Sequence, residues 1–90
     1  MENSFFLEFV KKQHNKKILE ELLSFTEIDI ENFRKKMDSE DPNIKNWLAI
    51  EAEMFETPFD NYCIQKTDHL NKMKQAVQDR ISELALDHKV

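Results

Sequence analysis

Residues 41–73 read DPNIKNWLAIEAEMFETPFDNYCIQKTDHLNKM, and this stretch sets the architecture of the chain. It contains two helix-start signals, Asp41-Pro42 and Thr57-Pro58, in which a capping side chain precedes a proline at the first helical position. The stretch therefore predicts two consecutive helices. One runs from Pro42 to about Glu56, and the other continues from Pro58 to about Asp87.

Two charged residues of this stretch, Glu51 and Lys66, lie inside apolar helical stripes. The neighbours of Glu51 at i−4, i−3, i+3 and i+4 are Trp47, Leu48, Met54 and Phe55. If the two helices form an antiparallel hairpin, Glu51 comes within reach of Lys66 and of Tyr62. Two interpretations stay open, because a charge in an apolar setting is either paired or presented to a partner. The pair fixes the register of a helix seam, or it forms the polar centre of a groove that binds a partner.

The residues before this stretch predict two further helices. The first begins after Asn3 or Ser4 and continues to Phe25, since residues 11–17 are mostly good helix formers and contain no strong breaker. Thr26 and Asp29 are both credible N-caps for the second. The inward face of that second helix is marked by three apolar residues at helical spacing, Ile30, Phe33 and Met37.

The predicted C-terminal helix, of roughly 30 residues and about 45 Å, is long for a small domain. Its distal apolar residues are Val77, Ile81 and Leu84, which need cover from the first helix or from another subunit. We therefore expect residues 1–90 to form a single all-α domain. Its fold is a small four-helix bundle with an antiparallel hairpin of the third and fourth helices. A homodimer through the long helix stays open.

The composition excludes several classes of enzyme. The chain has no glycine, so it contains no Walker P-loop, no dinucleotide-binding fingerprint and no Gly-x-Ser-x-Gly nucleophile elbow. The lack of glycine favours helices joined by loops that need no left-handed residue, or that place asparagine there. The spacing of Cys63 and His69 does not suit a closed zinc site. We expect no catalytic residue, no metal and no cofactor.

The single cysteine and the N-terminal sequence indicate a compartment. Cys63 has no second cysteine with which to form an internal disulfide, which favours a reducing environment. The N-terminus resembles neither a signal peptide nor a transmembrane span. These features predict a cytoplasmic protein with no membrane partner.

Basic residues gather in two parts of an otherwise acidic chain, whose net charge is −5. Seven of the 13 Lys and Arg side chains form a candidate basic patch on the first two helices: Lys11, Lys12, Lys16, Lys17, Arg34, Lys35 and Lys36. Such a patch would bind phosphates in a salt-dependent way. Nucleic acid is nevertheless an unlikely partner, because the overall charge is negative and the predicted third helix carries three glutamates.

Aromatic residues are concentrated at the N-terminus, where Phe5, Phe6 and Phe9 supply three of the seven phenylalanines. They belong either to the core or to a surface that docks into a partner groove. The candidate partner-binding residues are therefore Phe5, Phe6, Phe9, Glu51 and Lys66. The sequence favours a non-catalytic protein-binding module, such as an adaptor, a chaperone or an inhibitor of another protein. The alternatives are a small nucleic-acid-associated regulator and a structural homodimer subunit.

Overall fold

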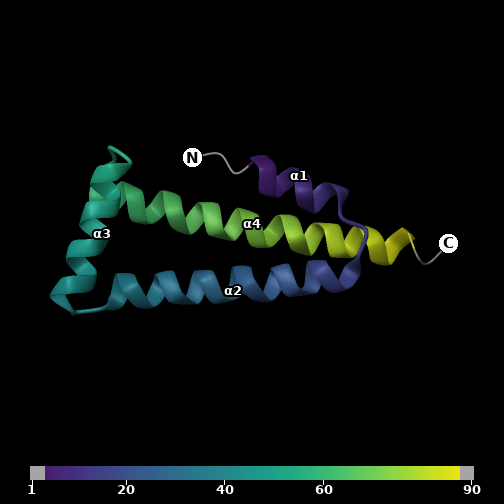
Figure 1. Ribbon diagram of the computed structural model, residues 1–90, viewed down its shortest axis with the longest axis horizontal. Helices are drawn as coiled ribbons and strands as arrows, with labels where there is room; N and C mark the ends of the chain where they lie inside the picture. The colour runs from purple at the N-terminus through teal and green to yellow at the C-terminus, as the bar shows by residue number, and fades with distance from the viewer. Residues whose placement is uncertain (1–3, 88–90) are drawn as a thin grey trace.

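A computed structural model describes residues 4–87 of the chain (Figure 1). This part consists of four helices and no strand: α1 (Ser4–Lys12), α2 (Lys16–Asp38), α3 (Pro42–Met54) and α4 (Phe59–Asp87). The predicted all-α class, the four helices and the long C-terminal helix are confirmed. Helices α2 and α4 lie side by side and antiparallel, α1 lies along the C-terminal half of α4, and α3 crosses the other end (Figure 1).

The pairing of α2 with α4 follows from a seven-residue repeat on both helices. The buried residues of α2 are Leu19, Thr26 and Phe33, and those in the middle and distal part of α4 are Leu70, Val77 and Leu84. A repeat of seven keeps one stripe of each helix facing the other along their whole length, as in a coiled coil. The expected antiparallel hairpin of α3 and α4 is not confirmed, because α2 is the long neighbour of α4 and α3 runs across the two (Figure 1).

The predicted boundaries of the first two helices are wrong. The expected helix from Ser4 to Phe25 is interrupted at residues 13–15, where the side chain of Asn15 caps the start of α2. Its Oδ1 accepts hydrogen bonds from the backbone N–H groups of Lys17 at 3.0 Å and Ile18 at 3.4 Å. These bonds satisfy donors that a new helix leaves without partners, so the break is stabilised locally.

Arg80 of α4 fixes this connector in place. Its Nε donates to the carbonyl oxygen of Gln13 at 2.9 Å, and its Nη2 lies 3.2 Å from Nδ1 of His14. The third contact is an ion pair with Glu83 at 3.0 Å, and the Arg80 side chain is only 12% exposed. The connector between α1 and α2 is thus tied to a residue more than 60 positions later in the chain.

Thr26 and Asp29 are interior residues of α2 rather than N-caps. The Thr26 hydroxyl donates to the carbonyl oxygen of Leu23, one turn earlier, at 2.8 Å. This local bond satisfies a polar group that is 98% buried, which allows threonine to occupy a core position of the repeat. The helix continues through both residues because the face of α2 that packs against α4 extends past them.

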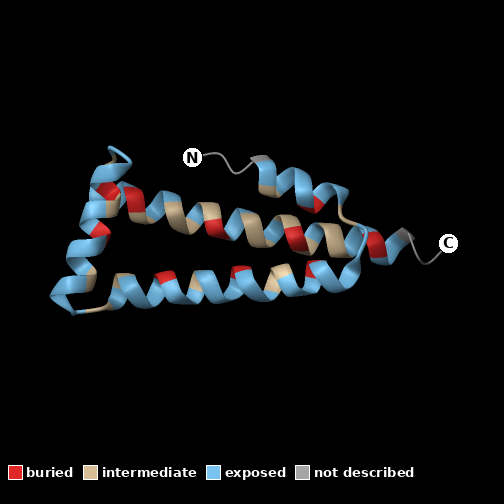
Figure 2. Ribbon diagram, in the orientation of Figure 1, coloured by how far each residue is buried: buried red, intermediate tan, exposed pale blue. Residues whose placement is uncertain are grey.

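Buried residues occur on all four helices (Figure 2), and the core that they form is divided into two clusters. The distal cluster joins three helices through Val10, Leu19, Val77 and Leu84. The proximal cluster joins the other end through Phe33, Leu48 and Leu70. The distal part of α4 is therefore covered by α1 and α2 within one chain. The Cα atoms span 54 × 23 × 15 Å, a long, thin shape in which few side chains are fully buried.

The turn between α3 and α4 uses left-handed backbone without glycine. Glu56 has a φ of 52°, and its N–H bonds to the carbonyl of Glu53 at 2.9 Å. The N–H of Thr57 bonds to the carbonyl of Ala52 at 3.0 Å. This is the Schellman arrangement of a helix C-terminus, in which the left-handed residue is usually glycine and sometimes asparagine. The expectation that a chain without glycine avoids this conformation, or gives it to asparagine, is wrong at Glu56.

Candidate functional site

A groove of about 490 Å³ lies between α3 and the start of α4. We call it the α3–α4 groove, and it is lined by Trp47, Glu51, Met54, Phe55, Thr57, Tyr62, Gln65, Lys66 and His69. Its volume is within the range of sites that bind small molecules or single side chains of a partner. It contains both charged residues that the sequence singled out.

The groove holds a hydrogen-bonded group of three side chains. The Tyr62 hydroxyl donates to Oε2 of Glu51 at 2.7 Å, and Nζ of Lys66 lies 3.5 Å from the same oxygen. Lys66 Nζ also donates to the Tyr62 hydroxyl at 3.4 Å. Both contacts that the sequence left open for Glu51 therefore form. They join α3 to α4 even though the two helices cross rather than run side by side.

The environment of Glu51 favours its ionised form. Burial by itself raises the pKa of Glu51, but the hydrogen bond from Tyr62, the positive charge of Lys66 and hydrogen bonding from Lys66 and Trp47 outweigh it. The result is a pKa below the usual glutamate value. The carboxylate and the ammonium group thus neutralise each other inside the groove, with the two side chains 18% and 34% exposed.

Lys66 is also held by aromatic rings. Its ammonium nitrogen lies 4.9 Å from the centroid of the Phe33 ring and 5.8 Å from that of Tyr62. Rings at this distance attract a cation through their quadrupole. Phe55 stacks on Tyr62 with centroids 5.7 Å apart and planes inclined by 14°. The polar centre of the groove is consequently held in place by the walls that surround it.

The outer walls of the groove are apolar and open to solvent. Trp47 is 54% exposed, Met54 72% and Phe55 47%. Large apolar side chains that gather at one exposed place mark binding surfaces more often than isolated ones do. Trp and Met are also among the residues enriched at protein interfaces.

Neither Tyr62, which lines the groove, nor the neighbouring Cys63 is activated as a nucleophile. Burial raises the pKa of Tyr62, and the hydrogen bond to Glu51 and the negative charge of Glu51 raise it further. Burial also raises the pKa of the neighbouring Cys63 thiol, and the negative charge of Asp60 acts in the same direction. Both groups are therefore neutral at pH 7, whereas nucleophilic catalysis needs the thiolate or an activated hydroxyl. Within residues 4–87, no group of His, Cys, Asp or Glu side chains is arranged to hold a metal ion.

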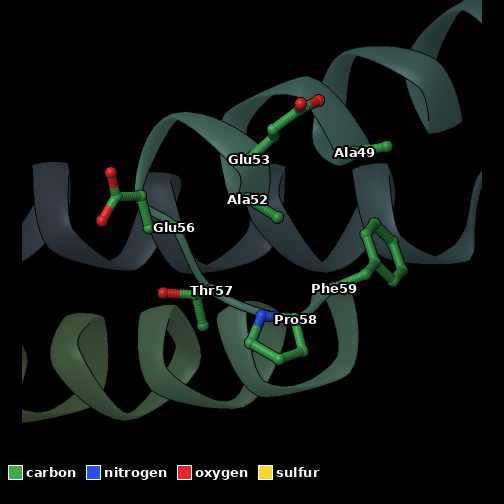
Figure 3. Close-up of a pocket in the computed structure, with 7 residues that line it drawn as sticks. All are labelled: Ala49, Ala52, Glu53, Glu56, Thr57, Pro58 and Phe59. Atoms are coloured by element: carbon green, nitrogen blue, oxygen red, sulfur yellow. The ribbon is translucent and has the colours of Figure 1, made fainter.

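A second hollow, of about 440 Å³, lies on the other side of the α3–α4 turn. Its lining includes two acidic residues, Glu53 and Glu56, beside Pro58 and Phe59. Figure 3 shows that the two carboxylates point away from each other, and that the rest of the lining is mainly aliphatic or aromatic. Without converging polar groups, this hollow is a less developed site than the α3–α4 groove.

The three N-terminal phenylalanines do not act together. Phe6 packs against the distal cluster, whereas Phe5 is 83% exposed and Phe9 is 42% exposed. Phe5 and Phe9 line a shallow hollow of about 320 Å³ on α1. This surface lies along the C-terminal half of α4, and the α3–α4 groove lies at the other end of that helix (Figure 1). The candidate residues thus belong to two separate surfaces.

The candidate basic patch is also divided. Lys11 and Lys12 end α1, Lys16 and Lys17 begin α2, and the group Arg34 to Lys36 lies in the last turns of α2. From Lys16 to Arg34 the rise along the helix is about 27 Å. Arg34 is engaged with Glu31 and Asp38 in ion pairs. The predicted single patch does not form, because the two groups lie near opposite ends of one helix.

The exposed face of α4 does not carry an apolar stripe for a homodimer. Its exposed large apolar residues are Phe59 at the first turn, Ile64 and Leu86, and the helical rise separates Ile64 from Leu86 by about 33 Å. The exposed residues between them at helical spacing are polar: Asp68, Asn71, Gln75, Asp79 and Ser82. No helix within residues 4–87 combines the length and the apolar character needed to cross a lipid bilayer.

Comparisons with protein-family models, with curated proteins and with solved structures give no match.

The sequence indicated part of the α3–α4 groove and missed the rest. Trp47, Met54 and Phe55 were found as helical neighbours of Glu51, but not as exposed walls. His69 and Gln65 at the rim were not assigned to a site. The sequence did contain a signal for His69. The spacing of three and four residues from Lys66 places Tyr62, Cys63, His69 and Leu70 on the same helix face as Lys66.

Proposed function

We propose that this protein is a non-catalytic protein-binding module whose α3–α4 groove receives an apolar side chain of a partner protein. The observation that carries the proposal is the exposure of Trp47, Met54 and Phe55 around an ion pair that is already neutralised. A bound apolar side chain would cover these walls without leaving a charge unpaired. Exposed aromatic residues beside a pocket are typical energetic centres of interfaces.

The charge around the groove supports a protein partner over a nucleic acid. Residues 42–71 carry five acidic and two basic side chains, and one of the two basic ones, Lys66, is paired with Glu51. This surface repels phosphates and suits a neutral or basic protein surface. An adaptor, a chaperone and an inhibitor would all use such a surface. Cys63, a free thiol that is partly buried in α4, fits a role in a reducing compartment such as the cytoplasm.

The experiment compares proteins captured from cell extract by the wild type, by Trp47→Ala and by Ile64→Ala. Ile64 is the matched control, because it is a similarly exposed apolar residue on the outer face of α4. We expect at least one partner that the wild type and Ile64→Ala retain and that Trp47→Ala loses by about tenfold or more. Circular dichroism of each variant establishes that the fold is unchanged.

Two outcomes contradict the proposal. In the first, no captured protein depends on Trp47. In the second, light scattering shows a homodimer that dissociates in Trp47→Ala, so that the occupant of the groove is another copy of the chain.

A further inference from the structure

Because α2 continues through Thr26 and Asp29, it presents an apolar stripe that the sequence did not indicate. Its members are Ile18, Phe25 and Ile28, which are 36%, 61% and 53% exposed. At 100° per residue they span about 80° of the helix circumference, so they share one face. We call this face the α2 stripe. Its centre lies about 120° around the helix from the residues buried against α4, Leu19, Thr26 and Phe33.

Two carboxylates lie within the α2 stripe. Glu21 and Asp29 are the i−4 and i+4 neighbours of Phe25, so both flank its ring on the same face. Both are exposed, and neither makes an ion pair within residues 4–87. The whole segment from Leu19 to Phe33 contains five acidic residues and no basic one. The stripe is therefore both apolar and strongly acidic.

We infer that the α2 stripe binds an amphipathic helix of another protein that carries Lys or Arg beside its apolar residues. A helix laid along α2 buries Ile18, Phe25 and Ile28 with anchors at spacings of three, four and seven residues. Its basic side chains meet Glu21 and Asp29, which make no ion pair with the part of the chain that the structure describes. This surface is separate from the α3–α4 groove, so the inference does not depend on the function proposed for that groove.

The same charges argue against a second copy of the chain as the occupant. A two-fold axis near Phe25 would bring Glu21 of each copy close to Asp29 of the other in an antiparallel pair of α2 helices. Four carboxylates would then share the centre of an interface, where the Leu19–Phe33 segments of the two copies supply no basic residue. Like charges placed opposite each other destabilise an interface, whereas a basic helix gains from the same groups.

The test uses a fluorescently labelled synthetic helix of Leu and Lys in an amphipathic pattern, with a Leu/Glu helix of the same pattern for comparison. Anisotropy titrations are made with the full chain and with three variants. Phe25→Ser/Ile28→Ser removes the apolar contacts, and Glu21→Gln/Asp29→Asn removes only the charges. Ile64→Ser is the matched control, since Ile64 and Phe25 have the same exposed fraction of 61%.

We expect the Leu/Lys helix to bind the wild type and Ile64→Ser equally, and the Leu/Glu helix to bind neither. Phe25→Ser/Ile28→Ser weakens binding by about tenfold or more. Glu21→Gln/Asp29→Asn weakens it and makes the affinity less sensitive to salt, because screening then has fewer charges to act on. Equal affinities for all variants, or equal binding of the two helices, would overturn the inference. Self-association that Phe25→Ser/Ile28→Ser abolishes would also overturn it, by identifying a second copy as the occupant.

Discussion

The Glu51 carboxylate remains charged in an apolar groove because its partners come from both helices that form the groove. Tyr62 and Lys66 reach it from α4, while Trp47 approaches from α3 itself. Removing the charge would leave the Lys66 ammonium without its carboxylate partner, although that group is still one-third exposed. The cost of such a change is therefore moderate rather than that of a fully buried ion.

We predict that Glu51→Gln lowers the free energy of unfolding by about 1 kcal/mol at pH 7. The folded-state pKa of Glu51 is lowered, so its contribution is complete above the unfolded pKa of about 4.3 and is lost as the pH falls through the folded value. The difference between wild type and variant should consequently shrink on acidification below about pH 4. Urea unfolding of both proteins at a series of pH values measures this difference in the free energy of unfolding.

The control for this prediction is Glu53→Gln, an exposed glutamate of the same helix, which should change stability little. A loss below about 0.5 kcal/mol at pH 7 for Glu51→Gln would contradict the paired and partly buried state of Glu51. So would a loss that is independent of pH.

Glu56 offers a second test at a single residue. Left-handed backbone costs a residue with a Cβ about 1 kcal/mol, a cost that glycine avoids. Glu56→Gly should therefore raise the free energy of unfolding by about 0.5–1 kcal/mol, and denaturant unfolding measures this change. The control is Glu53→Gly inside α3, which should lower it by about 1 kcal/mol. If Glu56→Gly instead lowered the free energy of unfolding, the Glu56 side chain would stabilise the fold by more than its left-handed backbone destabilises it.

At the scale of the elements, the short helix α1 depends on contacts at its C-terminal end. Nine residues are too few for a helix that is stable by itself in water. Val10 is 99% buried in the distal cluster, and Arg80 holds the connector that follows. Packing and the Arg80 contacts together hold α1 against α4.

Arg80→Ala is predicted to lower the free energy of unfolding by about 2 kcal/mol, because it removes charged hydrogen bonds to the connector from a largely buried side chain. Amide hydrogen exchange should become faster in α1 and in residues 13–17. Arg34→Ala is the control, since the ion pairs of Arg34 with Glu31 and Asp38 are exposed and lie within one helix; this substitution should cost less than about 0.5 kcal/mol. Similar exchange in both variants would show that Arg80 does not hold α1.

The sequence predicted a helix boundary well where the residues that set the boundary lie next to it in the chain, and poorly where they are distant in sequence. Asp41 and Pro42 start α3 through their own side chains and ring, so the sequence was sufficient there. The break at Asn15 depends partly on Arg80, which is distant in sequence. Thr26 resembles a cap in isolation, yet it belongs to a repeat of seven that is recognisable only when α2 is paired with α4. The exposure of Trp47 likewise depends on how α3 crosses α4.

For the molecule as a whole, the main feature is a core in two clusters joined by α2 and α4. Thr26 lies on α2 between Leu19 of the distal cluster and Phe33 of the proximal cluster. Its hydroxyl donates a hydrogen bond within α2 rather than across to α4. We therefore expect each cluster to stabilise mainly the short helix that it contains. α1 belongs to the distal cluster through Val10, and α3 belongs to the proximal cluster through Leu48.

We predict that truncating one cluster loosens its own short helix first. Leu48→Ala and Val77→Ala remove nearly equally buried side chains, one from each cluster. Leu48→Ala should cost roughly 3 kcal/mol, with Val77→Ala costing somewhat less. Native-state hydrogen exchange should then accelerate mainly in α3 for the first variant and mainly in α1 for the second. Uniform acceleration along the chain in both would show that the two clusters open as one unit.

The division into two clusters also bears on how such a chain can change during evolution. Substitutions around Leu48 alter the end of the molecule that carries the α3–α4 groove, while the Val10 end keeps the long helices paired. A lineage can thus acquire a differently shaped groove without first losing the scaffold. The same separation lets residues around α1 diverge while the groove keeps its form.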